Sequence, residues 1–260
     1  MDAAEQINRC AEIILQSRRV IVFTGAGIST ESGIQDFRSP GGLWEQWNPE
    51  ELTYQKFMSS RASREHYWGF SRAIWPTMAH AKPNIGHFAI QDLFQMGKLD
   101  CIITQNVDGL HQSAGVPDEK VIELHGTLKY VSCLRCGKRW PREEIEKRMD
   151  ETGDKAPECD SCGGYLKQAT ISFGQSLPAE AISAAQSRSS ACDCFIVAGS
   201  SLVVYPAAQL PLMAKQAGAK LIIITLSQTP HDPYADLVIN QKTGPTLSQV
   251  SQKVKAGLTQ

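Results

Sequence analysis

The feature that most constrains this chain is a set of short apolar runs, each followed at once by small or polar residues. The runs cover residues 20–23, 102–103, 195–198 and 221–224, and they are apolar throughout rather than at every second position. Continuous apolarity is typical of strands covered on both faces, so the runs predict a parallel sheet with helices above and below it. Ligands bind such sheets beyond the carboxyl ends of the strands. We therefore expect the segments after these runs to line one site.

Size and composition favour one large α/β domain that carries a smaller module. The chain has 260 residues, of which 42% are hydrophobic and 20% charged, as in ordinary globular proteins. Its 26 basic and 27 acidic residues give no strong field for nucleic acid. No apolar run approaches the roughly 18 residues of a membrane span, and residues 1–5 do not resemble a signal peptide. We expect no nucleic-acid partner, no membrane association and a cytoplasmic location.

Helical patterns lie between the apolar runs. Residues 3–17 and 86–97 place apolar side chains at helical spacing, which predicts amphipathic helices. Residues 206–218 predict another helix, which Pro211 is expected to bend or split. Residues 40–84, rich in Trp, Ser and Arg, predict an irregular helical insertion.

Four cysteines form two Cys-x-x-Cys pairs separated by 22 residues: Cys133, Cys136, Cys159 and Cys162. This spacing is typical of a zinc ribbon, whose four thiolates give a closed, structural site. The surrounding segment 131–166 holds few large apolar residues, so a metal would supply folding energy that it lacks. The alternative of four unliganded thiols in a charge-rich segment is poorer. The other four cysteines, expected to be reduced core residues, are Cys10, Cys101, Cys192 and Cys194.

A glycine-rich turn follows the first apolar run at residues 25–29, GAGIS. Such a turn lets backbone N–H groups approach a phosphate, although the third glycine of the usual fingerprint is missing. Taken alone, this segment is as compatible with a tight strand-to-helix turn as with cofactor binding. The polar continuation to residue 39, with Asp36, Phe37 and Arg38 on a loop over the site, favours cofactor binding.

Two further polar segments carry candidate chemistry. Residues 104–111, TQNVDGLH, follow a buried strand directly, and so many polar groups there are costly unless they bind one another or a ligand. Residues 123–126, ELHG, contain His125. A single histidine beside glycine is more often a turn or core residue than a catalytic base. Only the neighbouring motifs favour a catalytic role for His125.

Together these motifs resemble the sirtuin family over nearly the whole chain and in the family's order. The resemblance also includes residues 173–178, FGQSLP, and 199–202, GSSL. It implies a Rossmann-like parallel-sheet domain (1–39, 85–130 and 167–260) and a small lobe made of the helical insertion (40–84) and the zinc module (131–166). NAD and an acyl-lysine peptide would meet between them. The implied activity is NAD-dependent protein-lysine deacylation, most often deacetylation, which yields nicotinamide, O-acyl-ADP-ribose and free lysine.

The resemblance also implies residue roles. His125 would act as general base on the ribose, Asn106 and Asp108 would hold the nicotinamide carboxamide, and Phe37 would exclude water. The implied catalytic residues are His125 and Asn106. The implied cofactor-binding residues are Gly25, Ala26, Gly27, Ser29, Asp36, Phe37, Arg38, Gln105, Asn106, Val107, Asp108, Gly199, Ser200, Ser201, Thr225, Leu226, Ser227 and Thr243.

Three positions depart from the family pattern: Gln35 replaces a proline, Gln175 a glutamate and Thr225 an asparagine. The substrate peptide is expected to lie as an added strand between residues 173–175 and 203–206. Relatives that favour acidic acyl groups carry a Tyr-x-x-Arg pair, whereas Tyr67 is followed here by Phe70. We therefore expect acetyl or apolar acyl groups to be preferred over succinyl.

Two other functions remain open. Protein mono-ADP-ribosyl transfer would use the same NAD cleft, and a non-enzymatic NAD-sensing or zinc-ribbon interaction module would release no nicotinamide. The intact His125 and the apparent peptide groove favour deacylation over both.

Overall fold

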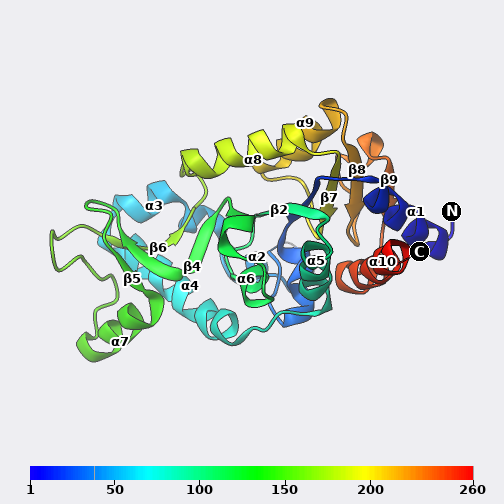
Figure 1. Cartoon of the computed structure of the whole chain (residues 1–260). Helices are drawn as coiled ribbons and strands as arrows, with labels where there is room; N and C mark the ends of the chain where they lie inside the picture. The colour runs from blue at the N-terminus through cyan, green and yellow to red at the C-terminus, as the bar shows by residue number, and fades with distance from the viewer. Residues whose placement is uncertain (38, 260) are drawn as a thin grey trace.

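A six-stranded, wholly parallel sheet forms the centre of the molecule. The computed structural model describes residues 1–37 and 39–259, so the prediction made for Arg38 lies outside the described residues. The strand order is β3-β2-β1-β7-β8-β9 (Figure 1). The strands are β1 (Val20–Thr24), β2 (Leu99–Thr104), β3 (Val121–Glu123), β7 (Cys194–Ala198), β8 (Lys220–Ile224) and β9 (Leu237–Ile239).

Helices cover both faces of this sheet, as the continuous apolarity of its strands predicts. One face carries α1 (Ala3–Gln16), α5 (Ile85–Gln95) and α10 (Thr243–Leu258), and the other carries α8 (Ala179–Ala191) and α9 (Leu210–Gln216) (Figure 1). Along β1, Val20 and Val22 face the first group and Ile21 and Phe23 the second. The strands β1, β2, β7 and β8 therefore each contribute to two hydrophobic cores.

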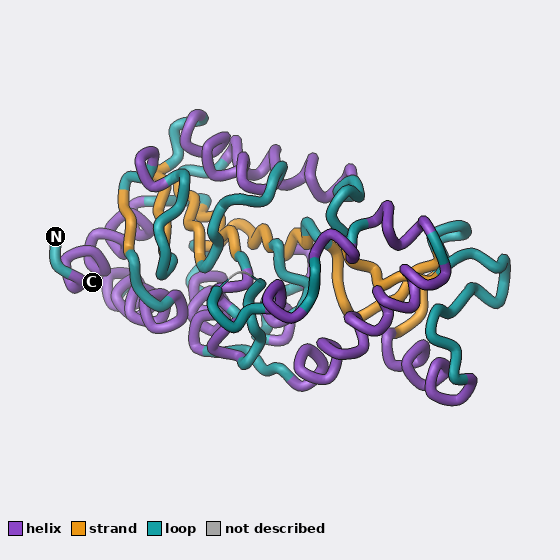
Figure 2. Tube along the Cα trace, turned by 180° about the vertical axis from the view of Figure 1, so that it is seen from behind, coloured by secondary structure: helices purple, strands orange, loops and turns teal. Residues whose placement is uncertain are grey.

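A second, three-stranded antiparallel sheet lies toward the end of the molecule opposite the two chain termini (Figure 2). It consists of β4 (Gly126–Cys133), β5 (Arg139–Pro141) and β6 (Leu166–Thr170), and α7 (Arg142–Thr152) packs against it. The neighbouring insertion contains α2 (Leu43–Gln46), α3 (Tyr54–Ser59) and α4 (Arg61–His80). We call this sheet, α7 and the insertion the small lobe.

The small lobe has a hydrophobic core that its two chain segments share. Trp140, Ile145 and Met149 from the zinc module pack with Trp68 and Phe57 from the insertion. These few apolar side chains of residues 131–166 complete a core begun by α3 and α4, in line with the expectation that this segment buries too little by itself. The residue boundaries between the Rossmann-like domain and the small lobe remain a prediction.

Several elements differ in detail from the expectations. The insertion is less irregular than expected, because α4 is a 20-residue helix that contains Pro76. The segment around Pro211 is divided, with a 3₁₀ turn at Ala207–Gln209 before α9, and Pro211 lies in the first turn of α9, where proline is tolerated. The four remaining cysteines are buried as expected. Among the described helices, which also include the short α6 (Leu110–Ser113), none is both long and apolar enough to cross a membrane.

Candidate active site

A cavity of about 970 Å³ lies at the carboxyl ends of the central strands and reaches into the small lobe. The segments that follow β1, β2, β7 and β8 all line it, as expected for a parallel sheet. The predicted residues that line it are Gly25, Ala26, Gly27, Ser29, Asp36, Phe37, Gln105, Asn106, Val107, Asp108, His125, Gly199, Ser200, Ser201, Thr225, Leu226, Ser227 and Thr243.

Two glycine turns meet backbone to backbone at one end of the cavity. Gly27 N donates to Gly199 O over 2.8 Å. A Cβ added to Gly27 would lie 2.8 Å from that same oxygen, and one added to Gly199, whose φ is +68°, would lie 2.4 Å from Ile28 N. Glycine is therefore required by close approach at both positions and by the left-handed backbone at Gly199.

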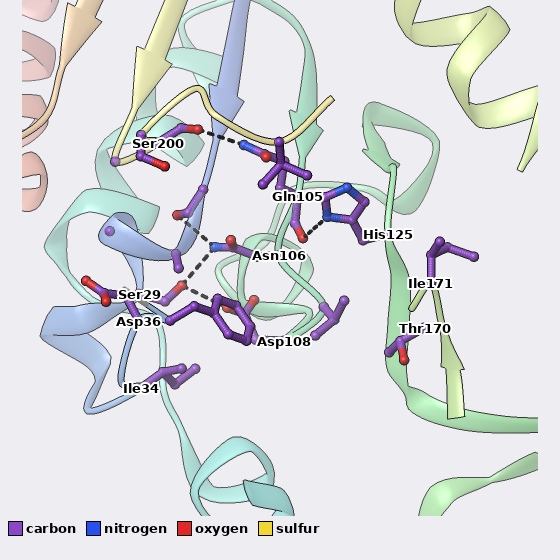
Figure 3. Close-up of a pocket in the computed structure, with 18 of the residues that line it drawn as sticks. Ser29, Ile34, Asp36, Gln105, Asn106, Asp108, His125, Thr170, Ile171 and Ser200 are labelled. Carbon is purple, nitrogen blue, oxygen red and sulfur yellow. Dashed lines mark hydrogen bonds between the residues drawn. The ribbon is translucent and has the colours of Figure 1, made fainter. Parts of the chain in front are cut away.

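Asn106 and Asp108 are joined to the glycine turn by hydrogen bonds (Figure 3). Asn106 Nδ2 donates to Gly25 O and to Ser29 Oγ, each over 3.1 Å, and Ser29 Oγ donates to Asp108 Oδ2 over 2.8 Å. Asn106 Oδ1 accepts no hydrogen bond within the described chain. The fixed amide thus keeps an acceptor available to a ligand.

His125 lies between the parallel sheet and the small lobe. Its main-chain oxygen accepts from Ile171 N over 2.9 Å, and its Nδ1 lies 3.0 Å from Gln105 O (Figure 3). A carbonyl only accepts, so Nδ1 carries the hydrogen and Nε2 keeps its lone pair. Burial lowers the pKa of His125, although the bond to Gln105 opposes that shift. The geometry therefore provides a neutral, oriented imidazole beside the cavity.

Phe37 belongs to an aromatic cluster that runs from the loop after the glycine turn to the small lobe. Its ring centroid lies 4.9 Å from that of Trp44, which in turn lies 6.2 Å from Phe173 and 6.4 Å from Phe70. The main chain of the loop is held to α2, since Leu43 N donates to Asp36 O over 3.0 Å. The cluster gives the cavity an apolar wall on this side.

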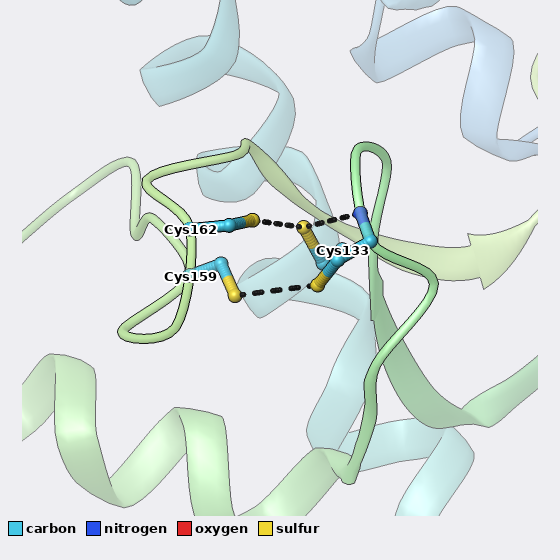
Figure 4. Close-up of side chains that lie close together, drawn as sticks. Cys133, Cys159 and Cys162 are labelled. Atoms are coloured by element: carbon cyan, nitrogen blue, oxygen red, sulfur yellow. Dashed lines mark hydrogen bonds between the residues drawn. The ribbon is translucent and has the colours of Figure 1, made fainter.

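The four zinc-ribbon cysteines come together in the small lobe (Figure 4). All four Sγ atoms lie within 4.8 Å of one another, with Cys133 and Cys162 3.5 Å apart and Cys136 and Cys159 3.7 Å apart. Tetrahedral zinc with bonds of about 2.3 Å places sulfurs about 3.8 Å apart. Burial would raise the pKa of Cys133, but N–H groups of Cys136 and Arg135 donate to its sulfur and lower that pKa to about 6. The donor set and its dimensions fit structural zinc.

Comparison with known proteins settles the family. The model of the Sir2 family matches residues 25–206. The chain is 45% identical to an NAD-dependent protein deacetylase of Bradyrhizobium diazoefficiens and 40% identical to an NAD-dependent protein deacylase of Archaeoglobus fulgidus; the alignments cover 95% and 96% of this chain and 95% and 97% of the relatives. This chain belongs to the Sir2 family.

Solved Sir2 structures agree with the fold of this family member. One, a Sir2 protein with a p53 peptide and NAD⁺, has 36% identity and a TM-score of 0.85, with full coverage of both chains. Another, a Sir2 variant with deacetylated p53 peptide and 3′-O-acetyl ADP-ribose, has 36% identity and a TM-score of 0.87 over 97% of this chain and 98% of that one. The predictions of a sirtuin and of an α/β fold with a zinc ribbon are confirmed.

One part of this Sir2 protein's site was missed in the sequence. Thr104 Oγ1 accepts from Asn106 N over 3.0 Å and lies 2.7 Å from Thr24 Oγ1, which lies 2.9 Å from His111 Nε2. Behind it, the rings of His87 and His111 are 5.0 Å apart. Burial lowers the pKa of His87 to about 4 and that of His111 to about 3. The threonines that end β1 and β2 were the available signal, because a buried hydroxyl needs a partner.

Proposed function

We propose that this chain is an NAD-dependent protein-lysine deacylase that transfers the acyl group to ADP-ribose and whose preferred reaction is deacetylation. Its relatives named above are a deacetylase and a deacylase, and one similar structure holds deacetylated peptide with O-acetyl ADP-ribose. The observation that carries the proposal for this chain is His125, whose free Nε2 borders the cavity that the glycine turns and strand ends also line.

The residues divide the task along the cavity. The turns at Gly25–Gly27 and Gly199–Ser201 bind phosphate and ribose, because their backbone allows the closest approach. Asn106 and Asp108 hold the carboxamide of nicotinamide and help it leave. As nicotinamide leaves, the acyl carbonyl oxygen forms a bond to the ribose C1′. His125 then accepts a proton at Nε2 from a ribose hydroxyl, so that this oxygen can attack the acyl carbon. Water finally adds, the lysine amine leaves and O-acyl-ADP-ribose is formed. Phe37, packed on Trp44, keeps water from the reacting carbon.

The peptide is proposed to bind as a strand between residues 173–175 and 203–206. The first edge is held in place, because Tyr54 N donates to Phe173 O over 2.9 Å and Gln55 Nε2 donates to Gly174 O over 3.1 Å. On the second edge, Val203 and Tyr205 are exposed. Main-chain pairing of this kind reads sequence weakly. Gln175 leaves the groove without the negative charge of the family's glutamate.

The preference for acetyl or apolar acyl groups over succinyl stays a prediction, and the surroundings of α4 support it. Phe70 stands where an arginine would meet a carboxylate. The nearby arginines are engaged elsewhere: the guanidinium of Arg64 lies 3.6 Å from the ring centroid of Tyr165, and Arg72 Nε is 2.9 Å from a carboxylate oxygen of Glu146. Turnover of a succinyl peptide above that of an acetyl peptide would contradict it.

We also propose one structural zinc at the four cysteines and a cytoplasmic location. A reducing compartment suits both the zinc thiolates and the four buried thiols. The zinc closes the small lobe and takes no part in the reaction, since four protein thiolates leave no open position.

Product analysis tests the proposed activity. The purified protein is incubated with NAD⁺ and an acetyl-lysine peptide, and nicotinamide, O-acetyl-ADP-ribose and free-lysine peptide are quantified by mass spectrometry. Equal amounts of the three products are expected. ADP-ribose on protein without loss of acetyl would identify a mono-ADP-ribosyltransferase instead, and no nicotinamide release would leave an NAD-binding module.

A further inference from the structure

The cavity continues past His125 into the small lobe. Figure 3 shows Ile171 and Thr170 on the side of His125 away from Ser29 and Ser200. Ile171 N donates to His125 O, and Gln168, which also lines the cavity, precedes it by three residues. An acetyl group reacting beside His125 leaves this far part unfilled, whereas a longer acyl group extends toward it.

One face of α4 forms the opposite wall of this far part. Tyr67, Phe70 and Ile74 line the cavity, and their spacing of three and four residues places them on the same side of the helix. The ring of Phe70 is packed 5.3 Å from that of Trp47. The wall is therefore mainly apolar and fixed.

A buried amide interrupts this apolar wall. Gln168 is 4% exposed and Tyr67 also 4%. Tyr67 Oη donates to Gln168 Oε1 over 3.4 Å, and Gln168 Nε2 donates to Ser71 Oγ. A glutamine amide has two N–H hydrogens and two acceptor lone pairs, so these bonds use one of each. The second N–H and the second lone pair of Gln168 remain for a ligand.

The surrounding charges do not suit an anion. Among the described residues that line the cavity near Gln168 there is no lysine or arginine. The three buried cations of the small lobe contact other groups: Lys167 Nζ donates to Thr170 O over 2.6 Å, Arg142 Nη2 donates to Glu146, and the guanidinium of Arg64 lies 3.6 Å from the ring centroid of Tyr165. A carboxylate placed here would stay unpaired, whereas a neutral hydroxyl or carbonyl would find both a donor and an acceptor.

We propose that Gln168, oriented by Tyr67, selects acyl groups of about four carbons that carry a neutral hydrogen-bonding group, such as 3-hydroxybutyryl, over their plain alkyl counterparts. The inference rests on the proposed deacylase function and names its substrate class. Gln168 is a specificity-determining residue in this account and takes no part in bond breaking.

The test compares kcat/KM for 3-hydroxybutyryl-lysine and butyryl-lysine versions of one peptide. In the wild-type protein the ratio should exceed one. Gln168→Met keeps the length of the side chain and removes its hydrogen bonds, so the ratio should fall about fivefold, the usual value of one neutral hydrogen bond. Tyr67→Phe, which frees the glutamine to rotate, should lower the ratio in the same direction. Gln186→Met on the exposed side of α8 is the matched control and should leave the ratio unchanged.

The outcomes separate this inference from the function on which it rests. Each preparation is also assayed with the acetyl peptide. The proposed selection by Gln168 is wrong if the wild-type protein turns over acetyl peptide but its ratio of kcat/KM values is one or less. It is also wrong if both variants keep the wild-type ratio. In either case the proposed deacylase function is unaffected. If no acylated peptide is turned over, the proposed function itself fails and this inference with it.

Discussion

The two parts of the molecule are held together in different ways. The strands β1, β7 and β8 run through two hydrophobic cores, and every residue of β1 and β7 is buried. The small lobe has one core of its own and four cysteines that fit zinc. All five tryptophans of the chain lie in the small lobe, at positions 44, 47, 68, 75 and 140. We therefore expect the small lobe, and not the central sheet, to need a metal for its stability.

Buried polar groups sharpen this contrast. Beneath the active site they are neutral, as in the bonds that Asn106 N and Thr24 Oγ1 donate to Thr104 Oγ1. In the small lobe they include cations: Arg142 is fully buried 4.7 Å from the ring centroid of Trp68, and burial lowers the pKa of Lys167 to about 7. Burying charge costs stability. The small lobe should therefore be the first part to open.

The largest effect is expected from removing zinc. Chelation, or Cys159→Ser, should unfold the small lobe and abolish deacetylation, because metal binding to such sites contributes about 10 kcal/mol or more. Tryptophan fluorescence should shift to the red, while hydrogen exchange in β1 and β7 stays slow. Cys192→Ala, at a buried cysteine outside the cluster, is the control and should retain one zinc per chain. Unfolding of both parts in a single transition would refute the contrast.

The next effect concerns the glycine turns. Gly199→Ala should destabilise the protein by more than about 2 kcal/mol and abolish NAD binding, because its Cβ would meet Ile28 N in addition to the left-handed strain. Gly153→Ala at the end of α7 has a similar φ of +70° but open space around it. It should cost only about 1–2 kcal/mol and preserve NAD binding. Urea unfolding measures the free energy of unfolding, and calorimetric titration measures NAD affinity. Equal losses in the two variants would contradict the requirement for close packing between the two glycine turns.

A smaller effect is expected in acid. His87 and His111 have pKa values of about 4 and 3 in the folded protein and about 6.5 when unfolded. The unfolded state thus binds more protons between these values. The stability that the neutral rings preserve is complete above pH 6.5 and falls below it, by up to about 1.4 kcal/mol per pH unit for each ring.

Protection factors of β1 and β2 amides, measured between pH 7 and pH 5, report this loss. His111→Gln, which can still bond Thr24, should reduce the slope, whereas His80→Gln, at the exposed last residue of α4, should leave it as in the wild type. An unchanged slope in His111→Gln would assign the acid sensitivity to other groups.

The sequence predicted best what local pattern determines. Continuous apolarity located β1, β2, β7 and β8, and the cysteine spacing located the zinc ribbon. Apolarity did not reveal β3 and β9, which have three residues each and too little pattern to read. Nor did it reveal α8, whose buried residues, Ala185 and Ser189, are too small to produce an apolar stripe.

The site depended on pairings that no local pattern contains. His125 gains its orientation from Gln105 O and Ile171 N, which lie 20 residues before it and 46 after it. The bond from Tyr67 to Gln168 spans 101 residues. Family resemblance supplied the grouping of the first set, but the second belongs to this chain's own residues and became visible only in the folded structure.

The role of His125 is the central claim, and one comparison tests it most directly. O-acetyl-ADP-ribose formation from NAD⁺ and an acetyl-lysine peptide is followed for the wild type and for His125→Ala, together with the Kd for NAD⁺. The account predicts a rate lower by about 10²–10⁴, the usual contribution of a general base, with NAD⁺ affinity nearly unchanged. A variant that forms the product within tenfold of the wild-type rate would contradict it.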